Sequence, residues 1–190
     1  MPSQTREAPT IEAETRGPAP VLSLGTHPAK LAVASAITLW CAFPPAGWGW
    51  LAWVALVPLC LLVRSNRSAW ALFGGSWLGG FVFWMLAINW VRLSEPGTAW
   101  LAWIVMSMVL SFWWPAFVFL ARLAVRRLHW PLMLAVPVIW VALEYGRAYA
   151  LTGFPWYYLA HSQYLYAPVI QIADITGSLG ISVVVAMANA

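Results

Sequence analysis

The sequence predicts an all-α fold, a polytopic bundle of transmembrane helices with about five spans plus a sixth that the chain end truncates. Of its 190 residues, 62% are hydrophobic and only 8% are charged, whereas a soluble domain carries roughly a quarter charged residues. The mean hydropathy is +0.75. The apolar residues also lie in runs separated by short basic clusters, which is typical of an integral membrane protein.

Residues 1–28 are predicted to form a disordered cytoplasmic tail, and residues 29–190 the transmembrane helical domain. The tail is rich in Pro, Thr, Ala and Glu and holds no apolar run long enough to insert. It also lacks the apolar segment and small-residue cleavage site of a signal peptide.

The first two apolar runs, Ala29–Phe43 and Trp48–Val63, flank the turn sequence PPAG. Each run has about 15 residues and would extend roughly 23 Å as a helix, against a hydrocarbon core of about 30 Å. They are therefore either short spans or a re-entrant pair. Both alternatives return the chain to its starting side.

The next two runs are long enough to cross a bilayer. In Trp70–Val91, the pair Gly75 and Gly79 has the small-xxx-small spacing that lets helices approach closely. Trp100–Ala124 is interrupted by Pro115, which removes a backbone hydrogen bond and predicts a kink.

Two further helices are predicted on either side of a loop of mixed composition. Leu132–Tyr149 is the fifth apolar segment, and Ile172–Ala190 begins the sixth, with Asp174 in a helix-initiating position. The sixth segment has no polar stop before the chain ends. We therefore expect an incomplete product of a longer gene, with a natural short form as the alternative.

The distribution of cationic residues predicts the orientation. One side of the membrane receives most of them and, by the positive-inside rule, is cytoplasmic. The N-terminus then lies in the cytoplasm, and the loop of residues 151–163 lies in the periplasm of a bacterium. Basic residues in such clusters set topology, so no nucleic-acid partner is expected. The predicted cytoplasmic residues are Lys30, Arg64, Arg67, Arg122, Arg126 and Arg127, and the opposite side carries Arg92 and Arg147.

The loop from Leu151 to Gln163 combines a glycine, a proline, four aromatic rings, a histidine and an amide. Non-helical backbone at membrane depth is tolerated only where protein or water satisfies its polar groups. The loop is therefore either a binding surface, with Phe154 and Trp156 as candidates, or an interfacial aromatic belt.

Two charged residues precede this loop. Glu144 and Arg147 are three residues apart, so a helix places them on one face. They either form a fixed charge pair that grips a phosphate or carboxylate, or extend from the helix end toward the headgroups.

The remaining polar candidates are weaker. Asn89 could hydrogen-bond between helices or face a cavity, and His161 is either a general base or a hydrogen-bonding or interfacial residue. Cys41 and Cys60 lie inside apolar runs, and the histidines are far apart, so neither a metal site nor a cofactor is expected.

Several motifs, in this order and spacing, resemble the N-terminal membrane region of bacterial apolipoprotein N-acyltransferases. They are INW at 88–90, EYGR at 144–147, LTGFPW at 151–156, HSQ at 161–163 and QIADITGSLG from residue 171. The resemblance covers roughly Ala29 to Ala190. His161 departs from it, since an aromatic residue can occur at this position.

The resemblance implies a multi-pass enzyme of the bacterial inner membrane that completes lipoprotein maturation. Such an enzyme takes an acyl chain from a phospholipid donor and transfers it to the N-terminal amine of a diacylglyceryl lipoprotein acceptor. Its chemistry belongs to a nitrilase-like domain with a Glu–Lys–Cys triad. The surface that would meet these lipids includes Asn89, Glu144, Arg147, Phe154, Trp156, His161 and Gln163.

A triad of this kind requires its three side chains around one reacting carbon. Lys30 is the single lysine and is predicted on the cytoplasmic flank, whereas Glu144 is predicted near the opposite face. No such cluster is expected in this chain, so its role would be to hold lipid. The alternatives are a non-catalytic lipid-binding scaffold and a small membrane transporter subunit, although no internal repeat supports the latter.

Overall fold

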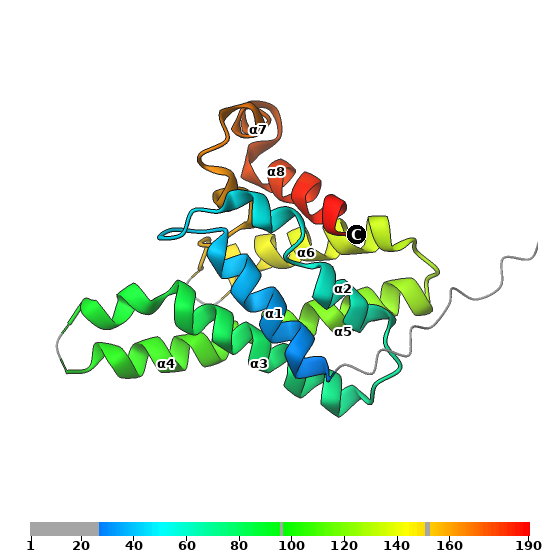
Figure 1. The fold of residues 1–190 in the computed structure, drawn as a ribbon, viewed down its shortest axis with the longest axis horizontal. Helices are drawn as coiled ribbons and strands as arrows, with labels where there is room; N and C mark the ends of the chain where they lie inside the picture. Colours follow the sequence, from blue (N-terminus) through cyan, green and yellow to red (C-terminus); the bar gives the residue numbers. More distant parts are fainter. Residues whose placement is uncertain (1–26, 96, 151–152) are drawn as a thin grey trace, which may run out of the picture.

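The computed structural model describes residues 27–95, 97–150 and 153–190, and in these residues the regular structure is helical (Figure 1). The all-α prediction is therefore confirmed. Residues 1–26 of the predicted tail lie outside the described residues. The elements are α1 (Pro28–Cys41), η1 (Gly49–Trp53), α2 (Val57–Arg64), α3 (Ala69–Ala87), η2 (Asn89–Leu93), α4 (Ala99–Leu110), α5 (Trp113–Arg126), α6 (Leu132–Tyr149), η3 (Leu159–Gln163), α7 (Ala167–Ile170) and α8 (Ala173–Asn189), where η denotes a 3₁₀ helix.

Within the described ranges, three helical segments are long and apolar enough to cross a membrane: 69–87, 99–126 and 132–149. Three shorter apolar segments, 28–41, 49–64 and 173–189, accompany them. The chain is thus a membrane protein by its helices, while the expected five spans and a sixth stay a prediction.

Helix α3 packs closely against α1 through its glycines (Figure 1). A Cβ atom placed on Gly79 would lie 2.6 Å from the Cβ of Ala32, and one placed on Gly75 would lie 2.8 Å from the backbone N of Ala29. Any larger side chain would force the two helices apart. The close approach predicted from the small-xxx-small spacing is confirmed.

The second apolar run, expected as one segment, divides into η1 and α2 with a break at residues 54–56. A side chain from the far end of the chain satisfies the backbone at this break. The Asn189 amide donates to the Ala52 carbonyl oxygen at 2.8 Å, and its Oδ1 accepts from the Leu56 N–H at 2.8 Å. Asn189 is 4% exposed, so the break is sealed inside protein.

The kink predicted from Pro115 is confirmed as a separation of α4 from α5 at Ser111 and Phe112. A proline nitrogen cannot donate to the carbonyl four residues earlier, which here belongs to Ser111. The Ser111 carbonyl instead accepts from the Trp114 N–H at 3.2 Å. This tighter turn brings Trp113 and Trp114 to the start of α5.

The predicted sixth segment is also interrupted. Asp174 lies in the first turn of α8, but the N-cap is Ile172 and no side chain caps the helix, so the expected capping role is wrong. Gly177 then interrupts the helix with φ of 69°. Glycine tolerates this left-handed conformation without a steric cost. The short helix α7 precedes the kink and lies at the outer tip of the molecule, and α8 runs back from there to pack against α6 (Figure 1).

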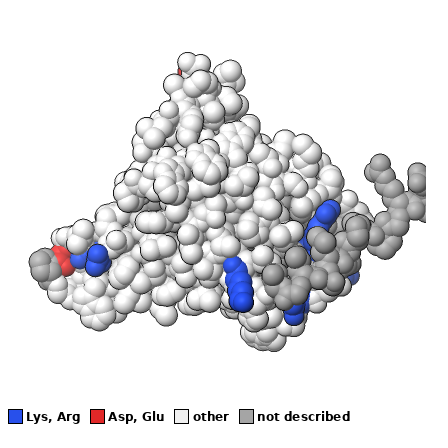
Figure 2. Space-filling view, in the orientation of Figure 1, with Lys and Arg blue, Asp and Glu red and all other residues white. Residues whose placement is uncertain are grey.

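Most of the face seen in Figure 2 is uncharged: Lys and Arg side chains show along its lower and right-hand parts and, beside acidic side chains, at the left tip, and a small acidic area shows at the top. At the α2 end, Arg122 and Arg126 both donate to the Ser65 carbonyl oxygen, at 2.6 and 2.7 Å. These arginines therefore stabilise the end of α2, where helix carbonyls lack intrahelical partners.

Candidate functional site

Glu144 and Arg147 lie on one face of α6 and are buried, with 4% and 7% of their surfaces exposed. The alternative in which this pair extends from the helix end toward lipid headgroups is therefore wrong. Both side chains turn into the bundle because their polar atoms find backbone and aromatic groups there.

The Glu144 carboxylate holds the start of η3. Its Oε1 atom accepts from the Trp140 Nε1–H at 2.9 Å and from the Leu159 N–H at 2.8 Å. Its Oε2 atom is buried and makes no hydrogen bond of normal length to the described residues, although the Ser182 hydroxyl also interacts with this carboxylate. The carboxylate is thus bound to the start of η3, to its own helix and to α8.

The Arg147 guanidinium holds the neighbouring backbone. It donates from Nη2 to the Trp156 carbonyl oxygen at 2.9 Å. The group also lies 4.8 Å from the ring centroid of Trp84 and 5.6 Å from that of Tyr158, within cation–π range. Its Nε atom is buried and has no hydrogen-bond partner among the residues that the structure describes.

Residues 153–163, here called the aromatic loop, are fixed by these bonds on both sides of Tyr157. The Tyr157 side chain points inward, and its hydroxyl donates to the Ala87 carbonyl oxygen. Tyr157 has φ of 56°, a conformation that non-glycine residues adopt only when their surroundings impose it. The preceding Trp156 is consequently left 54% exposed, with its ring centroid 6.0 Å from that of Trp90.

The structure brings Phe154 to the same cluster. Its ring centroid lies 5.8 Å from that of Trp84, and its N–H donates to the Arg147 carbonyl oxygen at 2.9 Å. Phe154 therefore helps to anchor the loop. Residues 151 and 152, which open the predicted motif, lie outside the described residues.

His161 stacks on Tyr158, with ring centroids 5.1 Å apart, and its Nδ1 accepts from the Tyr158 N–H at 3.3 Å. Partial burial, with a smaller contribution from the Arg147 charge, lowers the pKa of His161. The neutral ring is the form that fits this turn, because a protonated Nδ1 could not accept the bond. These contacts give His161 a role in loop structure.

Gln163 connects the aromatic loop to η1. Its Oε1 accepts from the Trp53 Nε1–H at 3.0 Å, and its Nε2 donates to the Gly49 carbonyl oxygen at 2.8 Å. It is 1% exposed. Asn89, in contrast, is exposed at the start of η2, so the structure does not bring it into the buried cluster.

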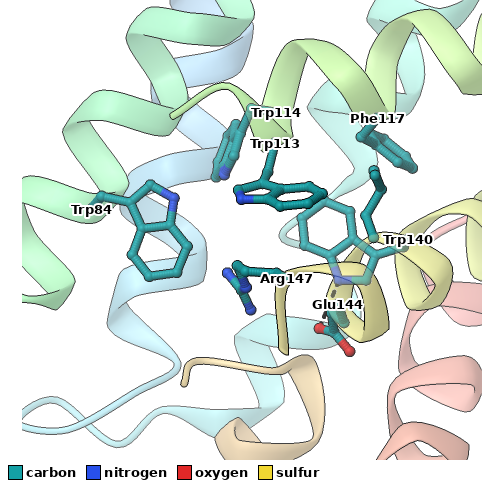
Figure 3. Close-up of a pocket in the computed structure, with 8 residues that line it drawn as sticks. Trp84, Trp113, Trp114, Phe117, Trp140, Glu144 and Arg147 are labelled. Carbon is teal, nitrogen blue, oxygen red and sulfur yellow. Dashed lines mark hydrogen bonds between the residues drawn. The ribbon is translucent and has the colours of Figure 1, made fainter. Parts of the chain in front are cut away.

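A partly open pocket, here called the tryptophan pocket, lies beside Glu144 and Arg147 (Figure 3). Its cavity volume is about 30 Å³, enough for one or two water molecules. Figure 3 shows the two charged side chains below a set of aromatic rings from three helices. The other lining residues are Trp84, Trp113, Trp114, Phe117, Trp140 and Leu143.

Sequence reasoning did not identify these tryptophans as part of the site. Trp140 lies four residues before Glu144, the spacing of neighbours on one helix face, so it could have been found. Trp84 comes from α3, and the sequence contains no local pattern that pairs it with Arg147.

The fold and the site define an all-helical membrane protein in which a buried glutamate and arginine anchor an aromatic loop. A family model described as the apolipoprotein N-acyltransferase N-terminal domain matches residues 35–190. The chain therefore belongs to the apolipoprotein N-acyltransferase family.

Individual relatives agree. An apolipoprotein N-acyltransferase of Geobacter metallireducens is 38% identical over 166 residues, which are 84% of this chain and 32% of that protein. One of Rhodopirellula baltica is 32% identical over 82% of this chain and 29% of its own length. A third, from Pasteurella multocida, is 27% identical over 80% of this chain and 29% of its own length. The chain thus spans about a third of the length of these relatives.

Proposed function

We propose that this chain is the membrane domain of an enzyme that transfers an acyl chain from a phospholipid to the N-terminal diacylglyceryl-cysteine of lipoproteins. It lies in the bacterial inner membrane with its N-terminus in the cytoplasm and the aromatic loop in the periplasm. Its task is to hold the donor and acceptor acyl chains beneath a catalytic domain.

The observation that carries this proposal is the anchoring of the aromatic loop. Two buried charged residues bond to its backbone and leave the Trp156 indole exposed beside Trp90. An exposed aromatic pair on a rigid support suits contact with acyl chains at the membrane surface, because tryptophan combines an apolar body with a polar N–H.

We place the acyl-transfer chemistry outside this chain. Lys30 and Cys41 lie near opposite ends of α1, and eleven residues of helix separate them by roughly 16 Å. A lysine and a cysteine so far apart cannot act on one carbonyl carbon. The second cysteine, Cys60, is 4% exposed in α2, as expected of a packing residue. The separation of Lys30 from Cys41 favours a non-catalytic, lipid-holding role for the chain, with the nucleophile supplied by a longer protein.

Genetic complementation tests the proposal. In a bacterium depleted of lipoprotein N-acylation, the complete gene should restore the modification and the 190-residue chain should not. Mass spectrometry of lipoprotein N-terminal peptides gives the readout. Restoration by the 190-residue chain alone would contradict the proposal that the acyl-transfer chemistry lies outside this chain.

A substitution in the complete protein tests the loop itself. Trp156→Ala removes the exposed indole without touching the bonds that the Trp156 backbone makes, so folding should be preserved. We expect N-acylation to fall about tenfold, with Leu93→Ala, an exposed apolar residue of η2, as the control. Unchanged acylation in Trp156→Ala would instead favour an aromatic belt at the membrane surface.

A further inference from the structure

Ser182 lies on the buried face of α8, next to the start of η3. The buried residues of this helix all follow the Gly177 kink, and their spacing places them on one helix face. The helix packs against α6 and against η3, and Ser182 is 0% exposed. The buried residues of α8 are Ile181, Ser182, Val185, Ala186 and Asn189.

The hydroxyl of Ser182 bonds outside its own helix, unlike the hydroxyls of two other buried serines. Ser76 and Ser107 each donate to the carbonyl oxygen four residues earlier in their own helices, at 2.6 and 2.8 Å. This bond is a common one for a serine inside a helix. The Ser182 Oγ instead accepts from the Ala160 N–H of η3 at 3.1 Å, and it also interacts with the Glu144 carboxylate of α6. Ser182 therefore links three elements of the candidate site.

The two contacts of Ser182 suit the chemistry of a hydroxyl group. Its lone pairs accept from the Ala160 N–H, and its single proton is available to the carboxylate, which only accepts when it is ionised. Glu144 Oε1 in turn accepts from the Leu159 N–H at 2.8 Å. The first N–H groups of a helix lack intrahelical partners. At η3 two of them are bound by a glutamate and a serine that also contact each other.

This cap determines the backbone that leads to the exposed indole. Trp156 lies two residues before Tyr158, which is the N-cap of η3. Without the Ser182 hydroxyl, the Ala160 N–H would be buried and unpaired, and such a group costs its full desolvation free energy. The Glu144 carboxylate would also lose its contact with α8. The start of η3 would then be less firmly held, and the indole would no longer keep one orientation.

We infer that Ser182 is a positioning residue for the surface that holds the acyl chains: by capping η3 and orienting the Glu144 carboxylate, it fixes the Trp156 indole. The inference rests on the proposed function, because it assigns α8 a role in the same lipid contact. Ser182 is fully buried, so it acts on the lipid only through the aromatic loop.

Hydrogen exchange tests the capping of η3. The complete protein is purified in detergent, and mass spectrometry of a peptide covering residues 157–163 reports exchange at Leu159 and Ala160. In Ser182→Ala, exchange in this peptide should be about tenfold faster, as expected for loss of one buried hydrogen bond, while α3 keeps the protection of the wild type. Ser178→Ala is the matched control, because Ser178 is partly exposed one turn earlier in α8. It should exchange like the wild type.

Steady-state kinetics tests the effect on the lipid. Acyl transfer from a phospholipid to a diacylglyceryl peptide is measured in mixed micelles with the same variants. Ser182→Ala should raise the KM for the phospholipid about fivefold and leave kcat within about twofold, because a loosened surface binds the chains less well and the reacting groups are unchanged. A smaller amount of folded enzyme would instead lower kcat and leave KM unchanged.

Ser182→Cys covers the case in which Ser182→Ala does not fold. The thiol has nearly the shape of the hydroxyl but is a weaker donor and acceptor, so exchange and KM should change in the same direction by smaller factors. Wild-type exchange in residues 157–163, or a wild-type KM, in a folded Ser182 variant would overturn the inference. Trp156→Ala distinguishes this failure from failure of the proposed function. A raised KM in Trp156→Ala alone would leave the proposed function standing, whereas an unchanged KM in all of these variants would contradict both.

Discussion

Arginines hold backbone carbonyl groups at both ends of the bundle, but in different surroundings. At the α2 end, Arg122 and Arg126 share the Ser65 carbonyl oxygen, and Arg126 is exposed. At the α6 end, Arg147 is buried between Trp84 and Tyr158, with a buried glutamate three residues away. The first arrangement resembles ordinary helix capping, whereas the second encloses charge in an aromatic environment.

This difference indicates that the arginines have different roles at the α2 end and the α6 end. A pair of arginines in contact with solvent stabilises a helix end with little desolvation, and loss of one leaves the other in place. A buried charged pair costs more to form and is often no better for stability than an apolar pair. Its presence at the α6 end is better explained by the loop that it positions and by the pocket that it lines.

The largest effect is expected from Arg147→Ala. The substitution removes the bond to the Trp156 carbonyl and leaves the Glu144 carboxylate buried without a nearby cation, which typically costs about 3–5 kcal/mol. Equilibrium unfolding in mixed detergent micelles, followed by circular dichroism, measures the loss. Arg127→Ala changes an exposed arginine and should stay within about 0.5 kcal/mol of the wild type. Equal losses in both variants would remove the distinction between the two ends.

Gly79→Ala should lower the free energy of unfolding by a smaller amount. This substitution should affect both the α2 end and the α6 end of the bundle. The added Cβ would meet Ala32 at 2.6 Å, and overpacking of this kind typically costs about 1–3 kcal/mol. Helix α3 would shift, and it carries Trp84 at one end and follows the Ser65 turn at the other. Gly74→Ala is the matched control, because its Cβ would meet no atom within 4 Å. The same unfolding measurement should show no loss in that variant.

Arg122→Ala should cost about 1–2 kcal/mol. Ser65 keeps its bond to Arg126, but the longer contacts of Arg122 Nη1 with the Leu62 and Val63 carbonyl oxygens, at 3.2 and 3.3 Å, are lost as well. The double variant with Arg126→Ala should cost more than the sum of the two single changes, because it leaves the buried Ser65 carbonyl unpaired. Additive losses in a double-mutant cycle would contradict this sharing of one acceptor.

The smallest effect is a pH dependence from His161 at the α6 end. Its pKa is lowered in the folded protein, so the unfolded chain binds the proton more readily. Stability should therefore be highest above the ordinary histidine pKa of about 6.5 and fall as the pH drops below it. In the His161→Gln variant, the melting temperature should change less between pH 7.5 and pH 5 than it does in the wild type. An unaltered pH profile in this variant would assign the dependence to another group.

The sequence predicted the helical segments and their close packing well, because both depend on local patterns. The apolar runs predicted the helices. The spacing of Gly75 and Gly79 predicted a close helix contact, found between α1 and α3, and Pro115 predicted the break between α4 and α5. The face shared by Glu144 and Arg147 was also predictable from their spacing.

The bonding partners of these residues were not predictable in the same way. Helical periodicity shows which residues share a face, but it does not show that Glu144 would bond to the Leu159 backbone or that Trp84 would cover Arg147. These contacts depend on how three helices and a loop meet. The break between η1 and α2 was missed for a similar reason, since its hydrogen-bond partner is Asn189, more than 130 residues later.

The Asn189 contact has a consequence for how the protein is assembled in the membrane. Segments enter the bilayer in order from the N-terminus, so the break after Ala52 is made long before its amide partner is synthesised. Until α8 arrives, the unpaired backbone groups need water or a lipid headgroup, because hydrocarbon offers them no partner. The segment from α1 to α2 should therefore stay near the membrane surface and reach its final depth only when α8 packs against it.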